Sequence, residues 1–299
     1  MDRVVLTEEL SFSRLIMGML KLSEWEMSDG EAADFFEELL ELGITTFDHG
    51  DYYGNFECER RFGRILKLRP SLRERMEIVT KCGNISVRDE NGRAISRYYD
   101  TSKEHILAAC DASLSRLGVE RLDMLMLHRI DHLAPLEEIA EAFDRLRRSG
   151  KVRCFGVSNY LPAQLDALRS CYPEIHANQL PFSVYNLENF ENGNTYYALQ
   201  HKIGLMAFSP VAKGLIFTGQ DEKARRLRAA LETVREETGA ATPDEICYAF
   251  LAAHPAKLMP IIGSAKRGRI DAALRGMALS LSRSQWYRIY EASAGRVMP

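Results

Sequence analysis

The sequence predicts an α/β fold in which eight parallel strands close into a (β/α)8 TIM barrel. Short apolar runs alternate with longer amphipathic segments along nearly the whole chain of 299 residues. Most of these runs are apolar throughout, which is typical of strands that helices cover on both faces of a parallel sheet. No Gly/Ser-rich or Pro-rich linker divides the chain. Eight strand–helix units without a linker favour a closed barrel over an open doubly wound sheet, so we expect a single domain over residues 1–299.

The apolar runs define the strands of this barrel in chain order. Residues 4–6 and 10–12 are two β-prone runs around a polar turn, and they predict a short N-terminal hairpin. The eight barrel strands are predicted at residues 15–17, 44–47, 76–80, 124–127, 152–157, 176–180, 205–208 and 258–262.

Helical periodicity occupies most of the intervals between these strands. Apolar residues three or four apart predict helices at residues 29–42, 57–68, 102–117, 135–148, 162–170, 223–238, 269–276 and 284–294, the last being a C-terminal helix before a short tail. Ser28 or Asp29 caps the first helix, and Gly43, Gly118 and Gly150 follow helices as C-terminal caps. Residues 182–200 are polar, aromatic and rich in Asn, so they predict a loop rather than a regular helix.

The composition is that of an ordinary globular protein, with 46% hydrophobic and 27% charged residues. The 39 basic and 42 acidic residues leave a net charge of -3, which argues against a nucleic-acid partner. The N-terminus carries charges where a signal peptide is apolar, and no apolar run reaches the length of a membrane span. The six cysteines are scattered without a CxxC pair, which indicates reduced thiols rather than disulfides or a zinc site. We therefore expect a cytoplasmic protein with no membrane contact and no bound metal.

Polar and titratable residues follow seven of the eight predicted strands. In a (β/α)8 barrel the catalytic groups come from the carboxyl ends of the strands. These residues are, in chain order, Asp48, His49, Asp51, Tyr52, Tyr53, Lys81, His128, Arg129, Ser158, Asn159, Asn178, Gln179, Ser209, Ser264 and Lys266. A single strand-terminal lysine or a lone histidine usually has a structural role. The convergence of carboxylate, phenol, amine and imidazole on one rim instead indicates an active site.

Seven short motifs on these strand ends resemble those of the aldo-keto reductase family. They are Phe47-Asp48 with Tyr53-Gly54 and Glu57, Val79-Thr80-Lys81, Leu125-Met126-Leu127-His128, Gly156-Val157-Ser158-Asn159, Asn178-Gln179, Phe208-Ser209-Pro210, and Ile262-Gly263-Ser264 through Arg269. Each motif alone is weak, but seven in the family's order form a strong signature that covers nearly the whole chain. The resemblance implies an NADP-dependent oxidoreductase that reduces aldehyde or ketone carbonyls to alcohols.

The family's catalytic tetrad maps onto Asp48, Tyr53, Lys81 and His128. The resemblance implies that Tyr53 donates the proton to the carbonyl oxygen, although an unperturbed phenol titrates near pH 10. We expect the Lys81 cation to favour the phenolate and Asp48 to anchor Lys81. We expect His128 to bind and orient the carbonyl oxygen. The spacing from Asp48 selects Tyr53 over the neighbouring Tyr52.

The resemblance also implies a nicotinamide dinucleotide, although the chain lacks the Gly-rich fingerprint of a Rossmann fold. Ser158, Asn159 and Gln179 would hold the carboxamide, for which amide side chains supply both donors and acceptors. Phe208 would stack on the nicotinamide ring. The loop that would lie along the pyrophosphate of the cofactor contains Ser209, Pro210, Val211 and Gly214.

Three further residues resemble the family's site for an adenosine 2′-phosphate. Ser264, Lys266 and Arg269 offer a hydroxyl, an ammonium and a guanidinium, which suit a phosphate monoester. This set favours NADP(H) over NAD(H). Many family members place an acidic and an amide residue where this chain has Ala272 and Ala273, so the adenine end departs from the usual pattern.

Two other functions fit parts of the same pattern. A barrel of this kind could bind NADPH and serve as a regulatory or interaction subunit with little catalysis, although such a subunit need not keep all four tetrad groups. A metal-dependent hydrolase needs paired ligands on strand ends, and Asp48 with His49 is one candidate pair. The residues predicted around the substrate give no charge signature for an acidic substrate, although Arg129 leaves that class open. The sequence therefore does not identify the small-molecule substrate. No exposed apolar stripe stands out in the sequence, and a monomer is compatible with it.

Overall fold

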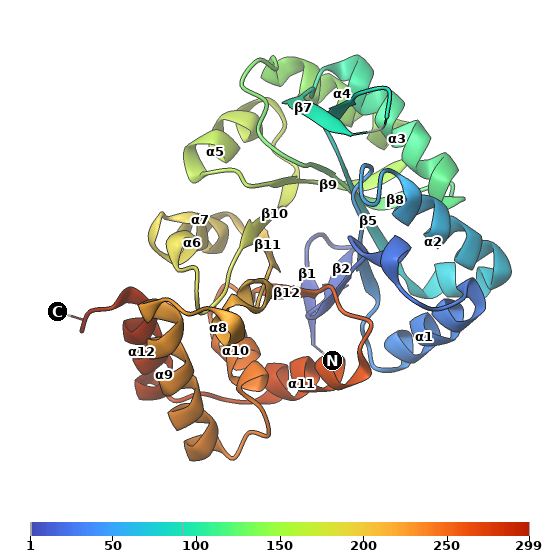
Figure 1. The fold of residues 1–299 in the computed structure, drawn as a ribbon. Coiled ribbons are helices and arrows are strands. Elements are labelled where there is room, and N and C mark those ends of the chain that lie inside the picture. Colours follow the sequence, from blue (N-terminus) through green and yellow to red (C-terminus); the bar gives the residue numbers. More distant parts are fainter. Residues whose placement is uncertain (1, 92, 299) are drawn as a thin grey trace.

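The computed structural model describes residues 2–91 and 93–298, and at its centre eight parallel strands form a closed barrel (Figure 1). Met1, Gly92 and Pro299 belong to the predicted 1–299 unit but lie outside the described residues. The barrel strands are β3 (Ile16–Gly18), β4 (Thr46–Asp48), β5 (Glu77–Cys82), β8 (Leu122–Leu127), β9 (Val152–Ser158), β10 (Ile175–Pro181), β11 (Gly204–Phe208) and β12 (Met259–Ile262). Each overlaps one predicted strand, so the predicted fold class is confirmed.

Helices surround the barrel, and most lie where the apolar periodicity predicts them (Figure 1). The major ones are α1 (Asp29–Glu41), α2 (Glu57–Leu68), α3 (Lys103–Leu117), α4 (Leu136–Arg148), α5 (Pro162–Cys171), α9 (Glu222–Thr238), α11 (Arg267–Ala278) and α12 (Arg283–Ala294). Ser28 and Glu31 exchange capping hydrogen bonds at the start of α1, and Gly118 ends α3 in the left-handed conformation. Within the described residues, none of the helices has both the length and the apolar composition of a membrane span.

Several shorter elements differ from the sequence-based expectation. The loop predicted at 182–200 contains two helices, α6 (Glu188–Glu191) and α7 (Asn194–His201), so that prediction was wrong for its second half. Its asparagines bond one another, because Asn189 Oδ1 accepts from the side chains of Asn192 and Asn194. Helix α10 (Pro243–Ala252) was not predicted, because all residues from 245 to 251 are buried and a helix buried all round has no polar face. The remaining short helical turns are η1 (Leu22–Glu24), η2 (Pro70–Arg75), η3 (Ala212–Gly214) and α8 (Leu215–Thr218).

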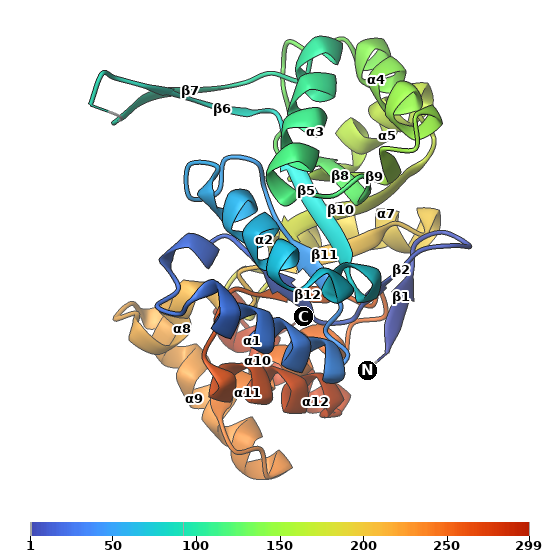
Figure 2. The ribbon, with the colours of Figure 1, turned by 90° about the vertical axis from the view of Figure 1, so that its right-hand side faces the viewer.

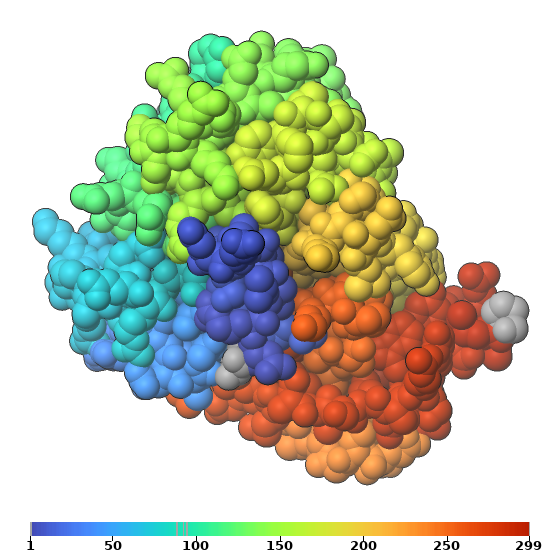
Figure 3. All heavy atoms as spheres, turned by 180° about the vertical axis from the view of Figure 1, so that it is seen from behind, coloured from blue at the N-terminus to red at the C-terminus, as the bar shows by residue number. Residues whose placement is uncertain are grey.

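The predicted N-terminal hairpin closes one end of the barrel. It consists of β1 (Arg3–Val5) and β2 (Ser11–Ser13), each displaced by one residue from the prediction. Its apolar side chains belong to the same cluster as the barrel interior, which contains Val4, Leu6, Leu10, Phe12, Ile16, Val79, Met124, Met126, Cys154, Ala177, Met206, Met259 and Ile261. Figure 3 shows the hairpin, in dark blue, at the centre of the face opposite to that of Figure 1.

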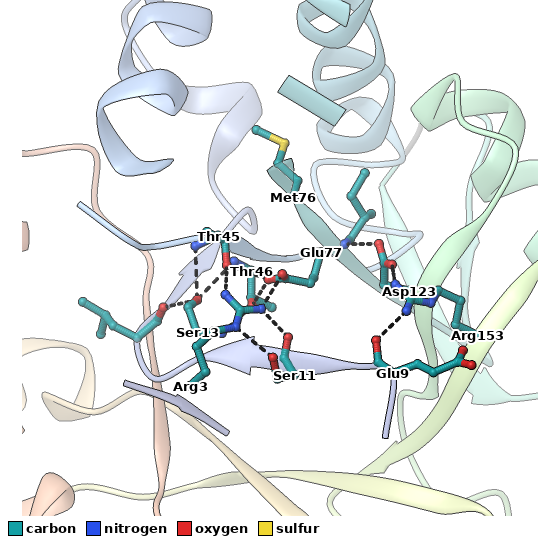
Figure 4. A network of polar contacts seen from close by, with 12 residues as sticks. Arg3, Glu9, Ser11, Ser13, Thr45, Thr46, Met76, Glu77, Asp123 and Arg153 are labelled. Carbon is teal, nitrogen blue, oxygen red and sulfur yellow. Dashed lines mark hydrogen bonds and ion pairs between the residues drawn. The ribbon is translucent and has the colours of Figure 1, made fainter. Parts of the chain in front are cut away.

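Polar contacts join this hairpin to the neighbouring barrel strands (Figure 4). Arg3 donates to Thr45 Oγ1 at 2.8 Å and pairs with Glu77 at 2.5 Å. The other carboxylate oxygen of Glu77 accepts from the hydroxyls of Thr45 and Thr46. The amino end of the barrel is therefore sealed by charge-assisted hydrogen bonds as well as by apolar burial.

A second hairpin, which the sequence analysis did not predict, leaves the barrel at the opposite end. Strands β6 (Asn84–Arg88) and β7 (Ala94–Tyr99) form a two-stranded antiparallel sheet that shares no pairing with the barrel. Only Gly83 separates β5 from β6. Figure 2 shows β6 and β7 projecting away from the body of the protein, on the side opposite to β1 and β2. We call these two strands the arm.

Asp123 provides a test of the sealed amino end. This buried carboxylate lies 3.0 Å from Arg73 and 3.0 Å from Arg153, and it accepts the backbone N–H of Ile78 at 2.9 Å. We expect Asp123→Ala to lower the free energy of unfolding by about 2–4 kcal/mol, because it leaves the buried N–H of Ile78 without its acceptor and removes the counter-ion of two guanidinium groups. Urea denaturation followed by circular dichroism measures this loss.

Asp144→Ala is the matched control for Asp123→Ala. Asp144 forms an exposed ion pair with Arg148 one turn away on α4. Exposed pairs of this kind contribute about 0.5 kcal/mol or less, so the control should unfold nearly as the parent does. Equal losses in the two variants would contradict a special role for the buried carboxylate.

Candidate active site

The predicted tetrad residues come from three neighbouring strands at the carboxyl end of the barrel. Asp48 ends β4, Lys81 is the penultimate residue of β5, and His128 directly follows β8. Strand β5 pairs with both β4 and β8 in parallel register. Tyr53 lies in the turn between β4 and α2. The structure therefore brings all four side chains to one mouth, as the sequence analysis predicted for the rim.

Lys81 is the centre of this group and is completely buried. Its Nζ donates to Asp48 Oδ1 at 2.8 Å, to the backbone oxygen of His49 at 2.5 Å and to the phenol oxygen of Tyr53 at 3.2 Å. An ammonium group has three N–H donors, so all three are engaged. Because the phenol oxygen accepts from Lys81, the Tyr53 hydroxyl keeps its own hydrogen for a different acceptor.

Two glycines allow the aromatic rings of the site to approach closely. The ring centroids of Tyr53 and His128 are 5.7 Å apart, and Tyr52 packs 5.1 Å from His128. A Cβ at Gly50 would lie 2.9 Å from the Tyr53 ring, so any larger residue would displace it. Gly54 has a φ of +56°, which a residue with a side chain rarely adopts. Gly54 belongs to the sequence motif, whereas the requirement at Gly50 became visible only in the structure.

The electrostatics of the tetrad differ in one respect from the sequence-based expectation. We expected Lys81 to favour the Tyr53 phenolate. Burial, and after it the Asp48 carboxylate, instead raises the pKa of Tyr53 well above its ordinary value. Tyr53 therefore holds its proton throughout the neutral range.

His128 is an uncharged hydrogen-bonding group in this environment. Burial, followed by the charges of Lys81 and Arg129, lowers the pKa of His128 well below its ordinary value. Its Nδ1 is buried without a hydrogen-bond partner in the described part of the chain. The imidazole is thus neutral at physiological pH, and its ring is held by packing against Tyr52 and Tyr53.

The residues predicted to hold a carboxamide lie together at the ends of β9 and β10. Ser158 Oγ donates to the backbone oxygen of Gln179 at 2.9 Å, and Asn159 Nδ2 donates to Ser158 Oγ at 2.7 Å. Gln179 Nε2 donates to Asp48 Oδ1 at 2.9 Å, a contact that the sequence analysis did not predict. This hydrogen bond connects the amide cluster directly to the tetrad.

Phe208 and the loop after it occupy the end of β11. Phe208 is half-buried and packs against the interior cluster of the barrel. The loop is tightly wound, with left-handed φ values at Ser209, Ala212, Lys213 and Gly214. Non-glycine residues in this conformation concentrate at ligand sites, where surrounding structure maintains the strain. The side chain of Lys213 is exposed and has no hydrogen bond or ion pair within the described residues, and the sequence analysis did not single it out.

The three residues predicted to bind a 2′-phosphate surround the start of α11. Lys266 is the N-cap, and its backbone N–H donates to Ser264 Oγ at 3.3 Å. The side chains of Lys266 and Arg269 are exposed and form no hydrogen bond or ion pair in the described chain. Arg267 between them pairs with two carboxylates. A helix N-terminus with two unpaired cations is an arrangement that suits an anion.

Two buried carboxylates behind the tetrad had no assigned role in the sequence analysis. Glu59 is fully buried, accepts from Thr80 Oγ1 at 2.6 Å and pairs with Arg116 at 2.7 Å. Asp51 is also buried, but within the described residues it has no ion pair, and its Oδ1 accepts only the backbone N–H of Tyr52 there. Burial, followed by the charge of Glu59, raises the pKa of Asp51 to about 7. Sequence alone gives no signal for such a carboxyl group, because its environment comes from distant segments.

Asp48 and His49 do not form the metal-ligand pair that was considered as an alternative. The Asp48 carboxylate accepts from Lys81 and Gln179. The His49 ring packs 4.4 Å from that of Phe62, and burial lowers the pKa of His49 to about 3. In residues 2–91 and 93–298, no group of three or more His, Cys, Asp or Glu residues is arranged to hold a metal ion.

Known proteins share both the sequence pattern and this architecture. A model described as "Aldo/keto reductase family" matches residues 14–294. The chain is 47% identical over 300 residues to the uncharacterized oxidoreductase YcsN of Bacillus subtilis, covering 100% of both chains. It is 33% identical over 298 residues to the 6-dehydroglucose reductase of Agrobacterium fabrum, covering 99% of both. The glycerol dehydrogenase AKR11B4 of Gluconobacter oxydans superposes with a TM-score of 0.84 at 21% identity, covering 100% of this chain and 97% of that one.

The chain belongs to the aldo-keto reductase family of oxidoreductases. The general reaction of this family is carbonyl reduction, and its members use nicotinamide cofactors.

The raised pKa of Asp51 predicts a specific pH dependence of stability. The folded carboxyl group retains its proton up to about pH 7, whereas the unfolded one releases it near its ordinary value of 3.8. The stability of the parent protein therefore falls as the pH rises between these two values. Asp51→Asn removes this titration and can keep the hydrogen bond from the Tyr52 N–H. We expect its stability advantage over the parent to grow by about 2–3 kcal/mol between about pH 5 and about pH 8.

Urea denaturation of both proteins at the two pH values measures this difference. Asp111→Asn is the matched control, because Asp111 is exposed and pairs with Lys151 on the surface. Its difference from the parent should be small and nearly independent of pH. An Asp51→Asn profile parallel to that of the parent would contradict the titration of Asp51 near neutrality.

Proposed function

We propose that this protein is an NADP-dependent reductase of aldehyde or ketone carbonyls, with Tyr53 as the proton donor. The observation that carries the proposal is the arrangement around Lys81, which donates its three N–H groups to Asp48, His49 and Tyr53. This arrangement orients the phenol and leaves its hydrogen available. A bound nicotinamide supplies the hydride for the carbonyl carbon, and the protein then has to protonate the carbonyl oxygen.

Proton transfer from Tyr53 follows from its environment. The raised pKa of Tyr53 keeps the phenol protonated at neutral pH, so the donor is present when a carbonyl binds. The Lys81 ammonium, already hydrogen-bonded to the phenol oxygen, stabilises the negative charge that develops on that oxygen as the proton leaves. Asp48 keeps Lys81 in place, and Gln179 in turn donates to Asp48.

We assign to His128 the orientation of the carbonyl oxygen. Because its lowered pKa keeps the imidazole neutral, His128 donates a hydrogen bond without competing with Tyr53 as an acid. Its ring stands 5.7 Å from that of Tyr53, which allows both to reach a single oxygen atom between them. Tyr52, beside both rings, would contribute an aromatic wall to the substrate pocket.

The proposed cofactor contacts are supported by the chemistry of the groups present. The hydrogen-bonded cluster of Ser158, Asn159 and Gln179 offers amide groups to a carboxamide. The left-handed backbone at Ser209 and Gly214 allows close approach of a pyrophosphate, and Lys213 adds a cation. Lys266 and Arg269 at the N-terminus of α11 suit a 2′-phosphate, which favours NADP(H) over NAD(H).

The substrate class and the compartment complete the proposal. The relative from Agrobacterium fabrum is named a 6-dehydroglucose reductase, so we place oxidised sugars with simple aldehydes and ketones in the first substrate screen. The six cysteines are free thiols, five of them buried. Free thiols are typical of a reducing compartment, and we propose a cytoplasmic location.

Tyr53→Phe tests the role of the phenol. We expect carbonyl reduction to fall by about a hundredfold or more, because general-acid catalysis is lost. NADPH binding, measured by fluorescence titration, should stay nearly unchanged. Tyr52→Phe is the matched control, because it removes the neighbouring hydroxyl, and it should keep most of the activity. Retained turnover in Tyr53→Phe would remove Tyr53 from this role, whereas NADPH binding without turnover in the parent would favour a regulatory subunit.

The double variant Lys266→Ala/Arg269→Ala tests the cofactor preference. We expect its affinity for NADPH to fall by about tenfold or more, because two charge-assisted contacts to a phosphate are lost. The affinity for NADH should change little. Arg267→Ala is the matched control, because Arg267 is already paired with two carboxylates. Equal losses for both nucleotides would show that this group does not bind the 2′-phosphate.

A further inference from the structure

The arm is an isolated two-stranded ribbon, and a ribbon of this kind is only marginally stable in water by itself. Its root is firmly attached to the barrel. The backbone N–H of Asp100 donates to the oxygen of Gly83 at 3.1 Å, and the buried Thr101 donates through its N–H to Asp131 at 2.9 Å. Beyond this root, β6 pairs only with β7 among the described residues. In that part of the chain, the outer edge of each strand of the arm is therefore unpaired.

Strand β7 also exposes an unusual amount of apolar surface for so short an element. Ile95, Tyr98 and Tyr99 are 63%, 52% and 40% exposed, which makes half of its six residues large apolar groups facing solvent. Exposed edge strands are normally protected by charged residues, proline, a β-bulge or a covering segment. The pairing of β7 with β6 has one irregularity, between Ala94 and Ser96, and is regular from Ser96 to Tyr99. Strand β7 contains neither lysine nor proline, and Arg97 is its only charged residue.

The backbone of β7 is positioned to continue the sheet. The hydrogen bond from the Asp100 N–H to Gly83 marks a bonded pair, and bonded and non-bonded pairs alternate along an antiparallel ladder. Arg97 and Tyr99 therefore fall on non-bonded pairs with Ser86 and Asn84. Their N–H and C=O groups point to the outer edge of β7, where a third strand would pair.

The charges on β7 indicate which strand would fit there. Arg93 immediately precedes the strand, is exposed, and has no side-chain partner within the described residues. Asp100 immediately follows the strand. Two copies of β7 placed antiparallel bring the basic end of each strand to the acidic end of the other, with the exposed apolar residues between them. A charge pattern that is complementary to its own antiparallel copy is the requirement for a two-fold symmetric contact.

We propose that the arm is the docking surface for a second copy of this chain, with the two β7 strands pairing antiparallel to form a four-stranded sheet. This pairing satisfies the outward backbone groups and covers Ile95, Tyr98 and Tyr99. Because the arm projects from the face that carries the candidate active site (Figure 2), the contact joins two barrels beside their mouths. The inference is independent of the reaction, since it requires no turnover.

Sedimentation velocity of the full chain, over protein concentrations spanning about two orders of magnitude, tests the association. We expect a dimer whose population rises with concentration. In Ile95→Lys/Tyr98→Lys, the dissociation constant should rise by about tenfold or more, because each copy brings like charges and lost apolar contacts to the same edge. Tyr196→Lys is the matched control, since Tyr196 is an exposed aromatic on α7 and should leave the dimer intact.

Cross-linking tests the pairing itself. Ser96 lies near the middle of β7, so antiparallel pairing brings the two copies of this position within disulfide range, below about 7 Å between Cα atoms. Ser86 lies on β6, and its two copies would be three strand spacings apart, about 14 Å. Under mild oxidation Ser96→Cys should form a covalent dimer, whereas Ser86→Cys and the parent should not. A parent protein that is monomeric throughout, a dimer that survives Ile95→Lys/Tyr98→Lys, or the absence of a Ser96→Cys cross-link would each overturn the proposal.

Discussion

The burial of the Lys81 ammonium is the constraint on which the active face depends. A cation without solvent costs several kcal/mol unless it is paired and fully hydrogen-bonded. Here the Asp48 carboxylate compensates the charge, while the His49 backbone oxygen and the Tyr53 hydroxyl oxygen accept hydrogen bonds from the ammonium group. Satisfying one buried charge therefore fixes the relative positions of β4, β5 and the turn that carries Tyr53. The geometry that suits proton transfer follows from this requirement.

The two ends of the barrel meet opposite physical demands. At the amino end, Arg3 pairs with Glu77, and the buried Asp123 pairs with Arg73 and Arg153. At the carboxyl end, His128 Nδ1 has no partner within the described residues, and Asp51 is a buried acid without a counter-ion. Groups of this kind reduce stability, and they collect where ligands and chemistry need them. The ion pairs of the amino end therefore contrast with these two buried groups beside the candidate site.

The arm lies outside the barrel, and the described residues of β6 and β7 contribute nothing to its hydrophobic core. It leaves the barrel one residue after β5, and Asp131, three residues after His128, holds its root. The end of β5, which carries Lys81, and the loop after β8, which carries His128, therefore anchor the arm. An association through β7 would bring a second molecule to the same face as the candidate site. That placement connects quaternary structure with access to the mouth of the barrel.

The sequence by itself determined the succession of strands and helices, because continuous apolar runs, helical periodicity and caps such as Ser28 and Gly118 are local signals. It also predicted that Asp48, Tyr53, Lys81 and His128 meet at one rim, from the strand ends and from the family resemblance, and the structure brings these side chains together. It missed α10, which is buried all round, and it missed the arm. The tertiary structure alone decided which three acceptors surround Lys81, that Gln179 donates to Asp48, and that Asp51 has no counter-ion within the described residues. Such contacts depend on distances between segments far apart in the chain, and local pattern carries no information about those distances.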